Sequence, residues 1–229
     1  GVMNFRGQLT RPMIPGGTFT VDVLLHPKLK QDDLDGLRKA LILLGTLGGL
    51  GSKARKGFGS LTLTALEGEA AGSVPDDVEA RLKQCLPEPL PAGTPEWTAW
   101  RKESRVVTVS LSDVPAIELL DALGREMVHY RSWGRNGQVL DQKSEKNFEE
   151  DHHLSKGQNV GIRYPRRVAF GLPHNYGKGD GNEVKPALQE HYRLARRLFV
   201  NVHNIADDSL PVGMATFLNA KFLPNYAQI

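Results

Sequence analysis

The sequence predicts a mixed α+β fold in two halves that are separated by a linker. Residues 18–25, TFTVDVLL, alternate apolar and polar side chains, which is the pattern of a strand with one buried face. The next segment places apolar side chains at helical spacing, at Leu34, Leu37 and Ile42. A stretch rich in proline and glycine, residues 68–95, then interrupts these patterns before strands and helices resume.

The first half, residues 1–73, is predicted to run strand, helix, loop, strand. The helix begins near Gln31 or Asp32, either of which can cap it, and it ends in a cluster of glycines. Residues 58–66, FGSLTLTAL, alternate leucine and threonine and are predicted as the second strand. We expect this half to be one domain, followed by a linker over residues 74–96 that holds one short amphipathic helix.

The second half, residues 97–229, is predicted to be a second domain with similar elements. Residues 104–111 are predicted as a strand, and residues 115–132 as a helix with Pro115 in its first turn. A polar segment rich in glycine and charge, residues 134–163, is expected to be a long loop. Further strands are predicted at residues 166–174, at 198–205 and, with the element type left open, within 212–224.

Positive charge is concentrated in the second half of the chain. The net charge of +3 and the pI near 9.0 do not by themselves indicate a nucleic-acid partner. From residue 125 to residue 197, however, 14 Lys or Arg stand against 9 Asp or Glu. Arginine is well suited to bidentate contacts with phosphate, so this excess favours a partner that carries phosphate groups.

Several classes of protein are excluded or disfavoured by composition. The single cysteine, Cys85, excludes a disulfide framework or a cysteine zinc site within this chain and favours a reducing compartment such as the cytoplasm. No apolar run of about 18 residues is present, so we expect no membrane span and no membrane partner. Asp151, His152 and His153 are adjacent and lack a metal-ligand spacing, so we expect no bound metal and no cofactor.

The most unusual segment is residues 48–61, GGLGSKARKGFGSL. It holds five glycines and three cations, and no acid separates them. Glycine allows the backbone to approach a ligand closely, and successive N–H groups can form an anion-binding nest. Phosphate binding is therefore the natural interpretation, while the simpler alternative is a helix C-cap followed by a turn, with cations near the helix C-terminus.

Two familiar nucleotide-binding motifs do not fit this loop. In a nucleotide P-loop the second glycine is followed by lysine, but here Gly57 is followed by Phe58. A dinucleotide fingerprint needs a third glycine where Ala54 stands, and it runs from strand to helix rather than from helix to strand.

Two further segments contain residues suited to RNA. Residues 129–138, HYRSWGRNGQ, interleave Tyr130 and Trp133 with arginines, as a groove for single-stranded nucleic acid requires, although a buried aromatic helix end is an equal alternative. Residues 165–182, PRRVAFGLPHNYGKGDGN, form either a binding or catalytic loop or an ordinary polar hairpin. If RNA is cleaved, His174 is the best candidate for a general acid or base.

These segments together resemble the RAMP proteins of CRISPR systems, and more specifically the first-numbered Cmr subunit of type III-B effector complexes. The stretches that carry the resemblance are LGTLGGLGSKARKGFGSL, YRSWGRNG, PRRVAFGLPHNY, LARRLFVNVH and FLNAKFLP. The resemblance implies two ferredoxin-like or RRM-like (RAMP) modules with a glycine-rich loop and no catalytic role. It also implies other Cmr subunits as partners and a position near the guide RNA's 3′ end, where the chain would help to capture target RNA in antiviral defence.

The sequence departs from this family at two places. The opening strand and helix of the first module are missing, so we expect a fragment that lacks part of the N-terminal module. Before the LFVNVH strand, Ala195-Arg196-Arg197-Leu198 stands where the family leads us to expect Arg-Arg-Ala-Ser-Pro, which leaves the contacts of that strand open.

We therefore predict a non-catalytic subunit that binds guide RNA, target single-stranded RNA or both. The predicted RNA-binding residues are Gly48, Gly49, Gly51, Lys53, Arg55, Lys56, Gly57, Gly59, Arg131, Arg135, Arg166, Arg167, His174, Asn175, Lys178 and Arg197. One alternative is a metal-independent RAMP endoribonuclease that processes guide RNA precursor. The other is a scaffold whose glycine loop docks a neighbouring subunit.

Overall fold

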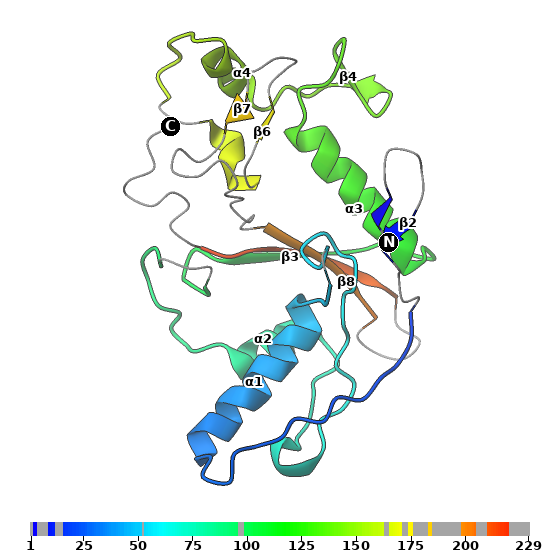
Figure 1. The fold of residues 1–229 in the computed structure, drawn as a ribbon, viewed down its shortest axis with the longest axis vertical. Helices are drawn as coiled ribbons and strands as arrows, with labels where there is room; N and C mark the ends of the chain where they lie inside the picture. Colours follow the sequence, from blue (N-terminus) through cyan, green and yellow to red (C-terminus); the bar gives the residue numbers. More distant parts are fainter. Residues whose placement is uncertain are drawn as a thin grey trace.

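The structure is a computed structural model, and its elements surround a three-stranded central sheet (Figure 1). It describes residues 2–3, 9–11, 16–51, 53–95, 99–162, 165–170, 174–175, 183–184, 198–204 and 210–219. In chain order the elements are β1 (Val2–Met3), β2 (Leu9–Arg11), α1 (Gln31–Leu47), η1 (Gly68–Ala70), α2 (Val78–Cys85), β3 (Arg105–Ser110), α3 (Ala116–Arg131), β4 (Gln138–Val139), β5 (Gln142–Lys143), α4 (Glu149–Ser155), η2 (Arg166–Phe170), β6 (His174–Asn175), β7 (Glu183–Val184), β8 (Leu198–His203) and β9 (Val212–Phe217).

The central sheet has the strand order β3-β9-β8. Strand β9 is antiparallel to both neighbours, so β3 and β8 run parallel to each other with β9 between them. The chain leaves β3 through α3 before it reaches β8, which makes a split βαβ arrangement. The predicted mixed α+β class is confirmed by these antiparallel pairs and by the four α-helices within the described ranges, while the predicted domain ranges remain a prediction.

Helices cover both faces of this sheet. Figure 1 shows α3 on one side and α1 with α2 on the other. On the α3 side, Leu119 is buried, and Gly213 of β9 allows close approach because a Cβ there would lie 2.6 Å from Cδ1 of Leu123. Ile42 of α1 and Met214 of β9 are completely buried. No helix among the described residues has the length and apolar character needed to cross a membrane.

The termini of the first two helices are fixed by acidic side chains. The carboxylate of Asp33 accepts the N–H of Lys30 at 3.3 Å, and Lys30 is the N-cap of α1, one residue before the first expected cap, Gln31. Asp77 caps α2, because its Oδ1 accepts the N–H of Glu79 at 2.8 Å and that of Ala80 at 3.1 Å. Both helices were predicted from the sequence and are confirmed.

A buried arginine joins α2 to the segment that follows the glycine loop. Arg81 is 1% exposed, and its Nε donates to the carbonyl of Pro75 at 2.5 Å. Its Nη2 donates to the carbonyl of Leu63 at 3.3 Å. Burial lowers the pKa of Arg81, and the charges of Asp76 and Asp77 oppose that change. The guanidinium thus ties the linker to the first half of the chain through backbone carbonyls.

Two predicted strands of the first half are not formed. Residues 18–25 have no strand partner among the described residues, and Phe19 and Val21 are 59% and 66% exposed. Over residues 58–66 only Ser60 pairs as in a strand, and the N–H of Leu63 instead donates to the carbonyl of Gly45 in α1 at 3.4 Å. The alternation indicated an extended backbone, but a strand also needs a neighbour, and sequence periodicity does not supply one.

Two predictions for the second half are also corrected. Residues 166–170 form the short 3₁₀ helix η2, so within the described part of the predicted strand 166–174 only His174 is in a strand, at the start of β6. The expected loop over residues 134–163 contains the β4–β5 hairpin and helix α4. By contrast, the strands and helix predicted at 104–111, 115–132 and 198–205 are confirmed, and the open assignment within 212–224 is strand β9.

We predict that acid destabilises the fold through His203. This histidine is 2% exposed, and burial lowers its pKa from 6.5 to about 4, with the charge of Arg81 acting in the same direction and the Leu61 backbone opposing it. The unfolded chain takes up a proton on this side chain below pH 6.5, whereas the folded chain does so only near pH 4. Stability is therefore complete above pH 6.5 and falls by up to about 3 kcal/mol as the pH drops toward 4, at about 1.4 kcal/mol per pKa unit.

Urea unfolding at pH 7.0, 5.5 and 4.5 measures this effect. The matched variant His203→Phe keeps an aromatic ring at this position and removes the titrating group, so its stability should fall less steeply between pH 7.0 and 4.5 than that of the wild type. Equal slopes for the two proteins would contradict the assignment.

Candidate RNA interface

The glycine-rich loop, residues 48–61, closes on itself. The N–H of Leu50 donates to the carbonyl of Gly59 at 2.8 Å, and Gly49 forms an antiparallel bridge with Ser60. A Cβ at Gly49 would lie 2.8 Å from the carbonyl oxygen of Gly59, so the two sides of the loop approach too closely for a side chain. This closure brings all three cations of the segment into one compact turn.

Several backbone amides of the loop are already used inside it. The N–H of Lys56 donates to the carbonyl of Lys53 at 2.8 Å, and the N–H of Ala54 donates to that of Gly51 at 3.3 Å. The N–H of Gly57 donates to the carbonyl of Ala54, also at 3.3 Å. These three amides are therefore engaged within the turn, and at these positions a phosphate would meet the cationic side chains rather than the backbone.

Most of the glycines have a packing role. Gly59 has φ +73°, and a Cβ there would overlap the carbonyl oxygen of Leu50. At Gly57 a Cβ would overlap the side chain of Leu120 in α3. Gly51, with φ +98°, faces open space. Close packing thus explains the glycines on both sides of the turn, and Gly51 is the loop glycine that leaves room for a ligand.

The loop is docked along the free edge of β8. The N–H of Val200 donates to the carbonyl of Arg55 at 3.2 Å, and the N–H of Val202 donates to Oγ of Ser60 at 3.1 Å. Lys56 forms a parallel bridge with Val200. Residues two apart on a strand present their N–H groups to the same side, so the loop satisfies consecutive donors of this edge.

A buried asparagine makes a further contact with the start of the loop. Asn201 of β8 is 1% exposed, and its Nδ2 donates to the carbonyl of Gly48 at 3.0 Å. The N–H of Gly48 in turn donates to the carbonyl of Leu44, which ends helix α1. The end of α1 is therefore joined directly to the central sheet.

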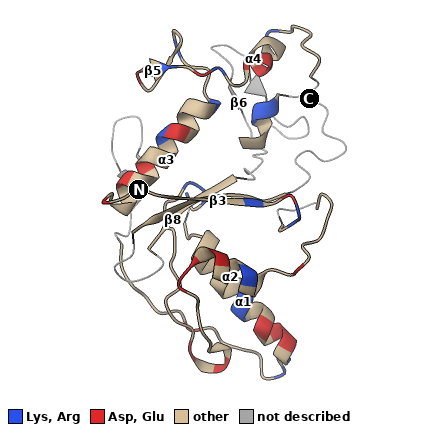
Figure 2. Cartoon of the chain, turned by 180° about the vertical axis from the view of Figure 1, so that it is seen from behind, with Lys and Arg blue, Asp and Glu red and all other residues tan. Residues whose placement is uncertain are grey.

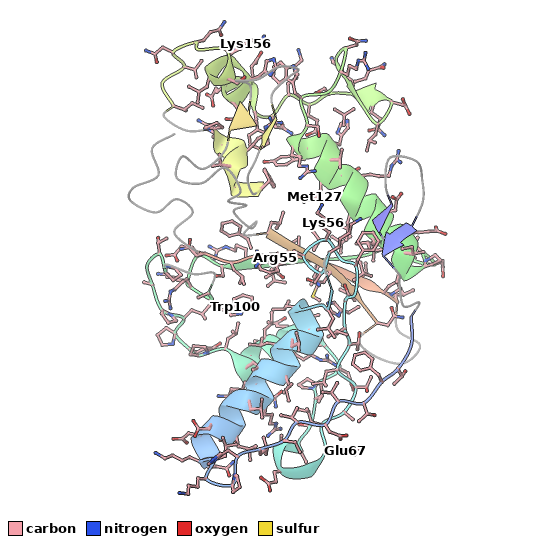
Figure 3. All side chains as sticks on the ribbon, in the orientation of Figure 1. Arg55, Lys56, Glu67, Trp100, Met127 and Lys156 are labelled. Atoms are coloured by element: carbon pink, nitrogen blue, oxygen red, sulfur yellow. The ribbon has the colours of Figure 1, made fainter. Side chains whose placement is uncertain are left out.

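Two of the three cations lie on aromatic rings. Nζ of Lys53 lies 5.4 Å from the ring centre of Phe58, and Cζ of Arg55 lies 4.7 Å from that of Phe199. Each such cation–π contact stabilises by roughly 0.5–1 kcal/mol at an exposed site. Lys56 is exposed. Figure 3 shows Arg55 and Lys56 near one another, beside the central sheet.

Two of the predicted arginines of the second half meet at the end of α3. Nη1 of Arg167 donates to the carbonyl of Arg131 at 3.0 Å. Burial lowers the pKa of Arg131, and the charge of Arg167 lowers it further. These two arginines line a small cleft, which the sequence did not predict because 36 residues separate them. The complete set of lining residues is Arg131, Ser132, Trp133, Lys146, Phe148, His152 and Arg167.

The remaining predicted cations lie apart from this cleft or outside the described residues. Arg166 is exposed and forms an ion pair with Glu150 at 3.1 Å. Arg135 is exposed in the turn before β4. His174 and Asn175 lie in strand β6, but their side chains fall outside the described part of the structure, and Lys178 and Arg197 lie outside it entirely.

The aromatic residues of segment 129–138 have different surroundings. Tyr130 packs edge-on against Phe148, with ring centres 5.5 Å apart, and against Phe170 at 6.2 Å. Trp133 is stacked on His152, with ring centres 4.2 Å apart and planes 7° from parallel. Tyr130 thus belongs to an aromatic cluster, but it is 49% exposed and so is not the buried helix end of the alternative interpretation.

Sequence reasoning missed Lys146 and Phe148 as members of a candidate site. Both lie in the segment expected to be a loop, and His152 was considered only as a metal ligand. Within the described residues no group of three or more His, Cys, Asp or Glu could hold a metal ion. Figure 2 shows acidic and basic segments interspersed along α1 and α3, so the helices do not form a purely basic surface.

We predict that Gly59→Ala destabilises the protein more than Gly51→Ala does. Both positions have positive φ, which costs alanine about 1 kcal/mol or more. The methyl group at position 59 would in addition collide with the carbonyl of Leu50, so its total cost should reach about 2 kcal/mol or more. Chemical denaturation of both variants measures the difference, and equal losses would contradict the packing role of Gly59.

Comparison with known proteins gives one match. A family model described as RAMPs: RAMP superfamily matches residues 3–62, a range that includes α1 and the glycine-rich loop. Neither the comparison with curated proteins nor that with solved structures produced a match. The match covers about a quarter of the chain, and it shows that residues 3–62 are similar to the RAMP superfamily.

Proposed function

We propose that this chain is a non-catalytic RNA-binding subunit of a type III-B CRISPR (Cmr) ribonucleoprotein. It would contact guide or target RNA near the guide 3′ end and aid the capture of target RNA. The observation that carries this proposal is the compact turn at residues 53–56, where three cations are held on the edge of β8 within the segment that matches the RAMP superfamily.

The arrangement of the second half supports a second RAMP module. In a ferredoxin-like sheet, one antiparallel strand lies between two parallel strands that are joined through a helix. Strands β3, β9 and β8 with helix α3 have this arrangement. The glycine loop of the first half is docked on β8 of the second half, so the proposed RNA contact lies where the two proposed modules meet.

The proposed contact is electrostatic and independent of RNA sequence. The ammonium of Lys53 and the guanidinium of Arg55 lie over the rings of Phe58 and Phe199, which restricts the positions of their charges, while Lys56 is exposed. Fewer rotamers are then lost when a phosphate binds, which favours affinity. Exposed aromatic surface at Phe58, which is 43% exposed, is also suited to stacking with an unpaired base.

The triple variant Lys53→Glu/Arg55→Glu/Lys56→Glu should bind single-stranded RNA at least about tenfold more weakly than the wild type. For a wild type that neutralises about four phosphates, log K falls with log salt concentration with a slope of about −3, and loss of three contacts makes that slope shallower by about 2. Fluorescence anisotropy with an RNA of about 20 nucleotides, repeated at several salt concentrations, measures both quantities.

The matched control is Lys28→Glu/Lys30→Glu/Lys102→Glu, which changes the net charge equally at three exposed positions outside the loop. The control should retain wild-type affinity to within about twofold, and circular dichroism should show the same helix content in all three proteins. Equal binding by the loop variant and the wild type would refute the RNA contact. The same samples run on a gel should contain intact RNA, and cleaved RNA would favour a nuclease instead.

A further inference from the structure

The cleft at the end of α3 has a basic lining, and the function proposed above, which rests on the glycine loop, does not account for it. It lies where the C-terminal end of α3 approaches α4 (Figure 1). Its walls include three cations, Arg131, Lys146 and Arg167, and none of its described lining residues is acidic. Cations from three separate segments therefore converge on one small space.

Arg131 is held in an electrostatically unfavourable position. Its side chain is partly buried, and the charge of another guanidinium, that of Arg167, acts on it. Burial and this like charge both lower the pKa of Arg131. No described side chain accepts a hydrogen bond from its guanidinium. An anion in the cleft would reverse this situation, because it would interact favourably with both cations.

The position of Arg167 is fixed by a buried carboxylate. Asp151 of α4 is completely buried, and its two oxygens accept the N–H groups of Arg166 and Arg167 at 2.7 Å each. Its Oδ2 also lies 3.9 Å from Nε of Arg167. This carboxylate therefore orients η2 and the Arg167 side chain, and its oxygens already interact with backbone donors. The fold thus holds the Arg167 guanidinium in place before any ligand binds.

The remaining wall is aromatic and carries a third cation. Trp133 is stacked on His152, and Nζ of Lys146 lies 5.3 Å from the ring centre of Trp133. Burial and the charges of Lys156, His153 and Arg167 lower the pKa of His152. Lys146 is exposed, and its ammonium group is carried by a flexible alkyl chain, so it can reach an anion at the mouth of the cleft.

The size of the cleft restricts what it can hold. Its accessible volume is about 10 Å³, which is room for one group the size of a water molecule. A phosphate oxygen fits such a space, whereas a nucleobase does not. Guanidinium groups bind phosphate oxygens with short, charge-assisted hydrogen bonds.

We infer that this cleft, formed by Arg131, Lys146, Arg167 and the Trp133–His152 stack, is a phosphate-binding subsite for the RNA strand. The inference rests on the proposed RNA-binding function and adds a second, separate contact to it. Leu120 contacts the glycine loop at Gly57, and Arg131 follows it by 11 residues in the same helix, which is about 16 Å along α3 at 1.5 Å per residue. One strand a few nucleotides long spans such a distance.

Lys146→Gln is the primary test, because this exposed side chain can be changed without disturbing the fold, and Arg131→Gln is the second variant. Lys156→Gln is the matched control: it removes one positive charge next to the end of α4 (Figure 3), and this charge acts on His152 but does not line the cleft. Each test variant should weaken RNA binding about three- to tenfold and make the salt slope shallower by about 0.7, as expected for one lost phosphate contact. The control should stay within twofold of the wild type.

The RNA is prepared in three forms, with a 5′-phosphate, with a 3′-phosphate and with hydroxyl groups at both ends. If the bound group is an internal phosphodiester, Lys146→Gln weakens all three RNAs alike. If it is a terminal phosphate, the variant weakens only the RNA that carries that phosphate. Both outcomes support a phosphate subsite.

Wild-type affinity in both test variants for all three RNAs would overturn the subsite. If the loop variant bound weakly in the same experiment, the proposed function would stand without the subsite. Failure of the wild type to bind any of the three RNAs would overturn the proposed function, and the subsite with it.

Discussion

The edge of strand β8 is the constraint on which the arrangement of the loop depends. A sheet edge carries backbone donors that need partners, and here the donors of Val200 and Val202 are satisfied by Arg55 and Ser60 of the glycine loop. This covers an edge that would otherwise be open to pairing with another chain. It also fixes the positions of the loop cations, because the residue that accepts from Val200 is itself one of them. The same contact joins the first half of the chain to the second.

Glycine is needed beside these cations because the loop must fit between two surfaces. It packs against β8 on one side and against Leu120 of α3 on another, and its two sides approach within backbone contact distance at Gly49 and Gly59. Side chains at these positions would prevent the fit. The cations lie between Gly51, which faces open space, and the closely packed Gly57. The glycines therefore shape the loop, and the proposed interaction with RNA belongs mainly to the charged side chains.

Helix α3 contacts the glycine loop near its first turn and lines the cleft at its last residue. One end region of the helix packs on the central sheet through Leu119, and its last residue, Arg131, belongs to the cleft. A helix is a stiff spacer, so the distance between the two basic sites is set by its length. At the cleft, the buried carboxylate of Asp151 accepts two backbone N–H groups and thereby positions Arg167. At the loop, Ser60 and the Arg55 carbonyl accept backbone N–H groups of β8 and position the loop cations in a similar way.

The sequence predicted those elements whose signals are local. The helices at α1, α2 and α3 have periodicity, caps or both, and β3 and β8 have the residue composition of strands. The strand predicted at residues 18–25 is wrong because alternation identifies an extended chain but not a partner for it. Helix α4 was missed because its charged, polar sequence, EEDHHLS, has no apolar face to reveal it. The convergence of Arg131 and Arg167 could not be predicted either, because it depends on Asp151 of this missed helix. In the sequence Asp151 stands out only as a possible metal ligand.

Cross-linking of 4-thiouridine RNA to the full chain, with the linked peptides mapped by mass spectrometry, tests the central claim most directly. The account predicts cross-links in the peptide that contains Phe58 and the loop cations, and a second set in the peptide that contains Trp133. Cross-links that occur only elsewhere in the chain, with both peptides recovered unmodified, would contradict it.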